Sequence, residues 1–561
     1  MIKKRSLLAF WLCMLGIAQT MFAQNIQVSG TITDGDLKET LIGVNVLLDG
    51  SSTGVISDID GNYTINAPAD GVLVFSFVGL DTKRVPINGR TRIDIVMSSN
   101  MQELEEVVVV GYGVMKKKDL TGSVGSVKAE ELSKVVSSNV GEALAGRVAG
   151  LHASTTSGDP GSTPVIRIRG GNSISGSNDP LWVIDGFISA GGASTISSED
   201  IESIEVLKDA SATAIYGARG ANGVILVSTK KGKAGKVNID FKATVGAQWL
   251  NKKPSLMNSE QTIEYWNAFD PNYLDQNINA QTNTDWIDEL TRTSMQEEYY
   301  MAVNGGNEKI TFKVSADYLK QNGIIKYNSD YQRANFATRV DFDINKYINA
   351  GVNVRYRYTK RNALGNGNIF QLAQSMSPLV KPYNEDGSYN LALNPCNLND
   401  KNGVDLYKDN GNGVKGNPIQ YLRERENPMY TKMLNLQGFI NAKILKDFIL
   451  RSEISLTTIN DWIDMYSPST LDIKTPSQIS VEEGITYEWV NTLNWKKDFN
   501  RIHSFNAVIG STIQGETTRG ASAYSRYMPI DGFKWNSLGS GNPIELSDIK
   551  VKSNYVKSTM A

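Results

Sequence analysis

The chain has 561 residues and a mass of 61.5 kDa, which is too long for one ordinary domain. It is 40% hydrophobic and 21% charged, proportions typical of globular rather than disordered chains. The 57 Lys and Arg residues nearly balance 59 Asp and Glu residues, so the net charge of -2 leaves no large basic field for binding nucleic acid. The two Cys residues, Cys13 and Cys396, cannot build a disulfide framework or a thiolate zinc site.

The amino terminus has the pattern of a secretory signal peptide. Three basic residues, Lys3, Lys4 and Arg5, precede an apolar run over 7–18, and small residues follow up to Ala23. No later stretch offers the roughly 20 apolar residues of a membrane-spanning helix. We therefore predict export after removal of residues 1–23, with a periplasmic protein, a secreted protein and an outer-membrane β-barrel left open.

Residues 24–98 carry short alternating segments separated by Gly and Asp turns, which predicts a small β-sandwich. The expected strands are 28–33, 43–48, 63–66, 72–77 and 92–97. The segment Asp58-Ile59-Asp60-Gly61 contains possible calcium ligands, but its register does not fit a calcium loop. A turn is the favoured interpretation.

A valine-rich segment follows within the linker 99–118. Four consecutive Val residues have high strand propensity, and their polar and glycine flanks isolate them from any neighbouring hairpin. Such a strand is free to pair with another chain, although the local pattern fits an ordinary buried strand equally well. The segment consists of Glu105, Glu106, Val107, Val108, Val109, Val110, Gly111 and Tyr112.

Residues 119–235 alternate helical and extended patterns, which predicts a compact α+β domain. Helices are expected over 129–136 and 140–148. Asp209 is expected to cap a short helical turn over 210–216 that Gly217 ends. Strands are expected over 165–169, 181–184, 201–207 and 223–229.

From Val237 onward, segments of about ten residues alternate apolar and polar side chains. Their length favours a transmembrane barrel, with lipid outside and water inside, over a soluble sandwich with shorter strands. Long loops such as 359–432 alternate with turns as short as 446–447, which is also typical of barrels. The Asp/Asn-rich run 408–413 fits a solvated loop better than a calcium site. Nine strands are expected, over 237–245, 297–303, 310–318, 336–344, 352–358, 436–444, 448–456, 485–493 and 505–513.

Several stretches resemble known families. GTITDGDLKETLIGVNVLLDGSSTGVISDIDGNYTI resembles the carboxypeptidase regulatory-like domain, a binding or spacer module without catalytic residues. GEALAGRVAGL, VIRIRGGNSISGSNDPLWVIDG and SIEVLKDASATAIYGARGANGVILVSTKKGK closely resemble the SusC/RagA family of TonB-linked outer-membrane transporters.

The resemblance implies a mainly β chain. It comprises a signal peptide (1–23), a regulatory-like sandwich (24–98), a TonB box and linker (99–118), a plug domain (119–235) and part of a 22-stranded transmembrane barrel (236–561). It also implies the outer membrane of a Gram-negative cell, with the N-terminal domain in the periplasm. The implied partners are TonB with its inner-membrane complex, a SusD-like surface lipoprotein, an oligosaccharide or peptide ligand, and outer-membrane lipid.

Five residues of the plug are candidates for ligand or barrel contacts. Arg167 and Arg169 share one predicted strand face and are expected to pair with barrel carboxylates, in a structural role rather than in substrate contact. Trp182 and Tyr216 have rings that suit stacking on sugars, but packing in the core is the favoured interpretation. Arg219 lies in a glycine-rich run that lacks the Lys-Ser/Thr of a phosphate loop.

No hydrolase, metalloprotease or phosphate-loop motif is present, so we expect no enzyme, cofactor or metal. The expected function is import of nutrient oligomers, glycan fragments before peptides. A surface receptor that does not transport is the alternative from another class.

The length of the barrel region departs from the family. At about 31 residues per strand, a 22-stranded barrel needs roughly 680 residues, whereas 325 follow Lys236. The last residues, 558–561, are polar and small rather than an aromatic barrel strand. We therefore expect a fragment or a truncated product with about half a barrel, and a product of that kind would be inactive.

Overall fold

The computed structural model describes residues 25–97, 107–110, 113–116, 124–132 and 139–560, apart from short gaps within these ranges. The chain forms two compact units, Met1–Val107 and Val108–Ala561, and each is described here by itself. The gaps are 36–38, 52, 78–79, 156–157, 190, 210–212, 272–273, 275–277, 279, 363–367, 392–416, 473, 500–502 and 547–549.

The first unit is the predicted β-sandwich. One sheet has the order β4-β1-β7 and the other β3-β2-β5-β6. Alternate side chains point into a shared core, where the rings of Tyr63 and Phe75 meet edge to face at 5.3 Å. The sequence patterns missed β3 and β6, which are very short. The strands are β1 (Asn25–Asp34), β2 (Asn45–Leu48), β3 (Gly54–Ile56), β4 (Asn62–Pro68), β5 (Val72–Ser76), β6 (Lys83–Pro86) and β7 (Ile95–Met97).

The segment between β3 and β4 is a turn, as predicted. The backbone N–H groups of Asp60 and Asn62 donate to the Asp58 carboxylate at 3.0 and 2.8 Å, and Gly61 adopts a φ of 74°. The Asp58 side chain therefore stabilises the turn itself.

The second unit contains the predicted α+β domain, called the plug from here on, which is built on a five-stranded sheet of order β10-β15-β16-β13-β14, where β13 runs parallel to β16. A second pair of strands, β11 (Leu151–Ser154) and β12 (Val165–Ile168), packs its apolar side chains into the same core. The main strands are β10 (Val124–Lys128), β13 (Leu181–Ile184), β14 (Phe187–Ile188), β15 (Ile201–Leu207) and β16 (Val224–Thr229).

The plug helices are shorter than predicted. The helix expected over 140–148 ends at Ala143, and Gly146 and Gly150 follow with φ of 73° and 79°, a conformation that ends helices. Of the helix expected over 129–136, the first four positions form α2, which the structure describes as far as Leu132, and residues 133–136 lie outside the described ranges. The helical elements are α2 (Ala129–Leu132), α3 (Val140–Ala143), η2 (Gly192–Thr195), η3 (Ser198–Asp200) and η4 (Ala214–Gly220).

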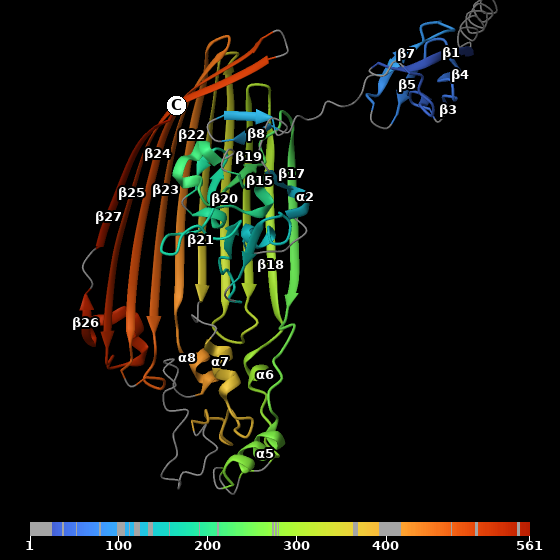
Figure 1. The fold of residues 1–561 in the computed structure, drawn as a ribbon. Helices are drawn as coiled ribbons and strands as arrows, with labels where there is room; N and C mark the ends of the chain where they lie inside the picture. The colour runs from blue at the N-terminus through green and yellow to red at the C-terminus, as the bar shows by residue number, and fades with distance from the viewer. Residues whose placement is uncertain are drawn as a thin grey trace, which may run out of the picture. The chain divides into compact units, whose positions relative to one another are not determined.

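Long antiparallel strands then form a curved sheet, here called the wall, against which the plug packs (Figure 1). All nine predicted strands are present in consecutive order, and β26 and β27 both pair with β25. The strands are β17 (Gly235–Gln248), β18 (Ser294–Gly306), β19 (Ile310–Asn322), β20 (Asp330–Asn345), β21 (Ile348–Asn362), β22 (Pro428–Leu445), β23 (Phe448–Tyr466), β24 (Ser477–Phe499), β25 (His503–Arg526), β26 (Asn542–Leu546) and β27 (Lys550–Met560).

The burial pattern of the wall is the reverse of that in a soluble protein. Apolar side chains on its outward face are exposed, with Phe241 at 71% and Ile454 at 62%. Charged side chains on the inward face are buried, with Lys313 at 6% and Arg333 at 2%. An apolar outward face and a polar inward face are what a membrane-embedded sheet requires.

The two ends of the wall differ. At one end the strands join through short turns, such as the two residues 346–347 and 446–447. At the other end long loops fold around their own apolar core, which includes Trp286, Leu290 and Leu422. None of the described helices is long and apolar enough to cross a membrane. The loop helices are α5 (Ser259–Phe269), α6 (Trp286–Leu290), α7 (Asn368–Ser375), α8 (Pro418–Glu424) and η5 (Asp531–Ser540).

Candidate functional site at the plug and the loop ends

The valine-rich segment forms β8 (Val107–Val110), which pairs with β9 (Gly113–Lys116) in a two-stranded sheet. The expectation that this strand stands isolated from any hairpin is therefore wrong. Only two residues separate the strands, a length at which local pairing is common. Glu105, Glu106, Gly111 and Tyr112 lie outside the described residues, and a TonB-binding role of the segment stays a prediction.

Arg167 and Arg169 form ion pairs within the plug. Arg167 pairs with Asp179, and Arg169 Nη1 lies 2.6 Å from Asp209 Oδ1. The structure thus gives neither arginine the barrel carboxylate that we expected. Arg169 also lies just beyond β12 with a φ of 56°, so it does not continue the strand face of Arg167.

Trp182 and Tyr216 both lie inside the plug. Trp182 is 7% exposed in the main plug core, and Tyr216 is 5% exposed in a smaller cluster with Leu207 and Val224. Neither ring is open to a ligand in this structure.

Arg219 extends from the plug to the wall. Its guanidinium lies 3.4 Å from the carboxylate of Glu488 on β24 and donates a hydrogen bond to Gln514 on β25. Glu488 is buried on the inward face of the wall, where it meets Arg219 of the plug.

Two plug carboxylates that sequence reasoning missed bind the wall more extensively. The first is Asp185, at the turn between β13 and β14. It accepts hydrogen bonds from the N–H and Oγ1 of Thr229 at 2.9 and 2.8 Å, and Arg355 Nη2 lies 2.6 Å away. Arg339 adds a second cation at 3.4 Å. Burial raises the pKa of Asp185, but Arg355, Arg339 and Thr229 outweigh it and hold the pKa below its usual value.

The second is Asp200, at the end of η3. It accepts from Lys313 Nζ at 2.7 Å, from the Tyr300 hydroxyl at 2.9 Å and from Ser315 Oγ at 3.0 Å. The neighbouring Glu199 pairs with Lys242 on β17 at 2.6 Å. An acid in the plug therefore meets a base on the wall at each of these contacts.

A polar interface of this kind differs energetically from an apolar one. Ion pairs recover only part of the cost of removing charges from water, so separating them into water costs less than separating an apolar core. The contacts still fix one position, because removing a single partner would leave a buried charge uncompensated. The arrangement can hold the plug firmly and yet release it.

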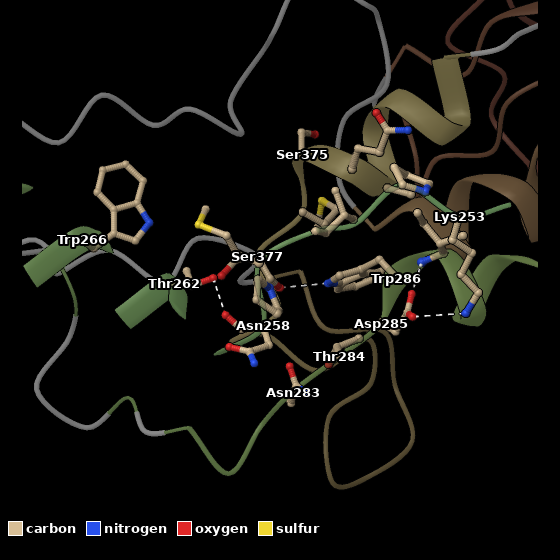
Figure 2. A pocket seen from close by; sticks show the side chains of 18 residues that line it. Lys253, Asn258, Thr262, Trp266, Asn283, Thr284, Asp285, Trp286, Ser375 and Ser377 are labelled. Atoms are coloured by element: carbon tan, nitrogen blue, oxygen red, sulfur yellow. Dashed lines mark hydrogen bonds and ion pairs between the residues drawn. The ribbon is translucent and has the colours of Figure 1, made fainter. Parts of the chain in front are cut away.

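A cavity of about 370 Å³ lies among the loops (Figure 2). Trp286 forms one side and donates its indole N–H to the Ser377 carbonyl at 2.9 Å. Asn258 caps α5 and accepts from the Gln261 N–H at 2.9 Å. Trp266 contributes a second ring, and its α5 neighbour Phe269 is 73% exposed. No sequence pattern predicted this cavity, because its lining comes from loops far apart in the chain.

Among the described residues, no group of three or more His, Cys, Asp or Glu side chains is placed to hold a metal ion.

Comparison with known proteins agrees with this architecture. Residues 116–224 match the TonB-dependent receptor plug domain, and residues 28–109 match the CarboxypepD_reg-like domain. TonB-dependent receptor P3 of Formosa agariphila is 32% identical over 98% of this chain and 55% of its own length. TonB-dependent receptor SusC of Bacteroides thetaiotaomicron is 35% identical over 66% of this chain and 37% of its own length.

Among solved structures, the RagAB peptide transporter matches with a TM-score of 0.66 at 23% identity, over 78% of this chain and 53% of that one. This likeness concerns the fold. The chain spans about half the length of the curated relatives it matches, and these relatives are named as receptors rather than as enzymes.

A plug domain on the polar face of an inside-out antiparallel wall, together with these matches, defines a TonB-dependent receptor of the outer membrane. Within that class, the chain belongs to the SusC/RagA family.

Proposed function

We propose that this chain supplies the plug and wall of a TonB-driven importer, with the short turns in the periplasm and the loops outside the cell. The observation that carries the proposal is the polar plug–wall interface, in which Asp185 and Asp200 bind wall cations. Short periplasmic turns and longer outer loops are the general rule for bacterial outer-membrane barrels, which supports the orientation.

TonB is proposed to bind the segment Val107–Val110 by adding a strand to it. The outer membrane has no ATP supply, so the energy for opening must arrive through contact with an inner-membrane complex. In a two-stranded sheet each strand keeps one free edge, and main-chain hydrogen bonds along that edge resist a pull. Force on β8 would then separate the plug from the wall.

The proposed cargo is a glycan fragment, with a peptide as the alternative, and a SusD-like lipoprotein is proposed to cover the loop ends. The loop cavity combines the Trp266 ring with amide side chains such as Asn258 and Asn283, groups that suit a hydroxylated ligand. Exposed aromatic residues on α5, Tyr265 and Phe269, favour a partner surface at the same end. The peptide alternative is favoured by the RagAB structures, which are named as peptide importers. No catalytic step is proposed.

A receptor that binds without transport is the second candidate. The two are separated by measuring surface binding and uptake of labelled oligosaccharides and oligopeptides in cells with and without TonB. Transport predicts that removal of TonB abolishes uptake and leaves surface binding. Binding with no uptake in either strain would establish the receptor and contradict import.

A further inference from the structure

On the outward face of the wall, the apolar band is followed toward the loops by one polar row. In the apolar band, Val352 and Ile454 are 49% and 62% exposed. The band runs along β21 from Ile348 to Tyr356, roughly 26 Å of strand, or about 20 Å of height at the usual strand tilt of about 40°, against an apolar band of about 25 Å in outer-membrane barrels. Toward the loops, the next row pairs Tyr358 with Lys432, Lys432 with Asn460, and Asn460 with Glu483. In the row beyond it, Tyr430 pairs with Trp462, and Trp462 pairs with Val481. A polar row flanked by aromatic residues is the arrangement expected where the apolar band of an outer-membrane barrel ends.

A groove of about 760 Å³ lies on the outward face at this depth. Its lining includes four aromatic and two polar residues from β21, β22, β23 and η5. They are Tyr358, Tyr430, Lys432, Asn460, Trp462 and Trp535.

The groove is roofed by η5, which folds down from the loop after β25. Asp531 of η5 accepts from the Ser469 N–H at 2.9 Å and from its Oγ at 2.7 Å, and it also binds the Tyr466 hydroxyl. Lys534 pairs with Glu426 at 2.6 Å. These contacts hold Trp535 over the groove, so its shape is built by the fold and does not depend on a flexible side chain.

Two lysines offer positive charge at the groove, Lys432 in its lining and Lys360 beside it. Lys432 is exposed, and Lys360 lies 5.9 Å from the centre of the Tyr430 ring. Neither lysine has an ion-pair partner among the described residues. Two acids also line the groove, and each accepts a hydrogen bond from a neighbouring side chain. Asp464 is buried and accepts from the Trp462 indole N–H at 2.7 Å, and Asp461 accepts from Thr431 Oγ1 at 2.5 Å. Glu483 is the remaining carboxylate of the polar row, one strand beyond Asn460.

We propose that this groove binds the phosphorylated sugar headgroup of a glycolipid in the outer leaflet. Flat aromatic faces suit sugar rings, and the two ammonium groups suit a phosphate. An ordinary phospholipid headgroup would leave most of the aromatic lining unused. The proposal rests on the orientation given under the proposed function, because that orientation places the loop end of the band in the outer leaflet.

The test uses the purified full chain in phosphatidylcholine nanodiscs that contain diphosphoryl lipid A, with bound glycolipid counted by native mass spectrometry. We expect at least tenfold more retained diphosphoryl lipid A than enzymatically dephosphorylated lipid A. The double variant Lys360→Gln/Lys432→Gln is expected to lose this preference. The matched control is Lys346→Gln/Lys497→Gln, which removes two lysines that lie over Tyr347 and Phe499 at the opposite end of the strands. It is expected to bind as the unchanged protein does.

A further variant, Trp535→Ala, tests the aromatic part of the site. It is expected to weaken binding of both phosphorylated and dephosphorylated glycolipid by about tenfold. Equal retention of phosphatidylglycerol and diphosphoryl lipid A, unchanged binding by the double lysine variant, or a paired second copy of the chain in place of lipid would each overturn the proposal. Because lipid binding is read without uptake, its failure and a failure of transport are separate results.

Discussion

The replacement Asp185→Asn tests how strongly the plug is held. Asp185 is the carboxylate that joins Arg355, at 2.6 Å, and Arg339 to the plug, and all three side chains are at most 11% exposed. The amide keeps the shape and part of the hydrogen bonding to Thr229 but removes the charge. Arg339 retains Asp341 at 2.7 Å, whereas Arg355 keeps only a neutral partner, Gln437. Removing one partner of a buried ion pair typically costs about 3–5 kcal/mol.

Hydrogen–deuterium exchange of β13 and β16 is the suitable assay, because Asp185 directly follows β13 and Thr229 ends β16, and these strands open only when the plug loosens. A loss of about 3–5 kcal/mol corresponds to exchange faster by a factor between roughly one hundred and several thousand. The matched control is Asp179→Asn, since Asp179 pairs with Arg167 at a site where its side chain is 66% exposed. An exposed pair is worth at most about 1 kcal/mol, or less than tenfold. Equal exchange in the two variants would show that the charge of Asp185 does not hold the plug.

Three further predictions concern the contacts between the plug and the wall and the segment that joins them. Asp200→Asn should speed exchange in β15 by a comparable factor, because Lys313 loses its carboxylate, and Glu202→Gln, which changes an exposed neighbour on β15, should not. The pKa of Asp185 is lower in the folded protein than its ordinary value of about 4, so its contribution to stability is complete above about pH 4 and is lost as the pH falls through the folded pKa. Protection of the plug from exchange should therefore decline below about pH 4 more in the unchanged protein than in Asp185→Asn. Gly232→Ala should destabilise the fold by about 1–3 kcal/mol and lower the unfolding temperature, because the added Cβ would lie 2.5 Å from the backbone N and O of Phe312. Gly246→Ala, where the added Cβ would have no atom within 4 Å, should change the unfolding temperature little.

The wall was the most predictable part of the chain. A sheet with lipid on one face and polar groups on the other imposes a period of two, and that period located every strand from β17 to β25. The strands are longer than the expected ten residues, up to 24 in β25, because they continue past the apolar band, where both faces are polar and the alternation fades.

The contacts of the plug were less accessible to sequence reasoning. Asp200 and Lys313 are 113 positions apart, and their meeting depends on the register of the plug against the wall. Arg167 and Arg169 were expected to reach barrel carboxylates, because the motif around them does not show that Asp179 and Asp209 of the plug lie within reach. The missed site could have been identified from Asp185, because this carboxylate follows an apolar strand of the plug and the later wall strands carry inward-facing arginines.

The wider consequence is that the plug is held by charge and could be released by force without exposing a large apolar core. Import would then require a pull at the valine-rich segment that exceeds the strength of a few ion pairs. The proposed glycolipid groove is independent of this step, because it lies on the outward face while the plug contacts lie on the inward face.

The most direct measurement of the central claim is uptake by cells that carry Val108→Pro, compared with Val108→Ala. Proline removes a backbone N–H from β8 and so weakens strand addition by TonB, whereas alanine keeps that N–H. The account predicts that Val108→Pro abolishes uptake while the protein still assembles in the outer membrane, and that Val108→Ala retains most of it. Normal uptake by the proline variant would contradict TonB-driven import through this segment.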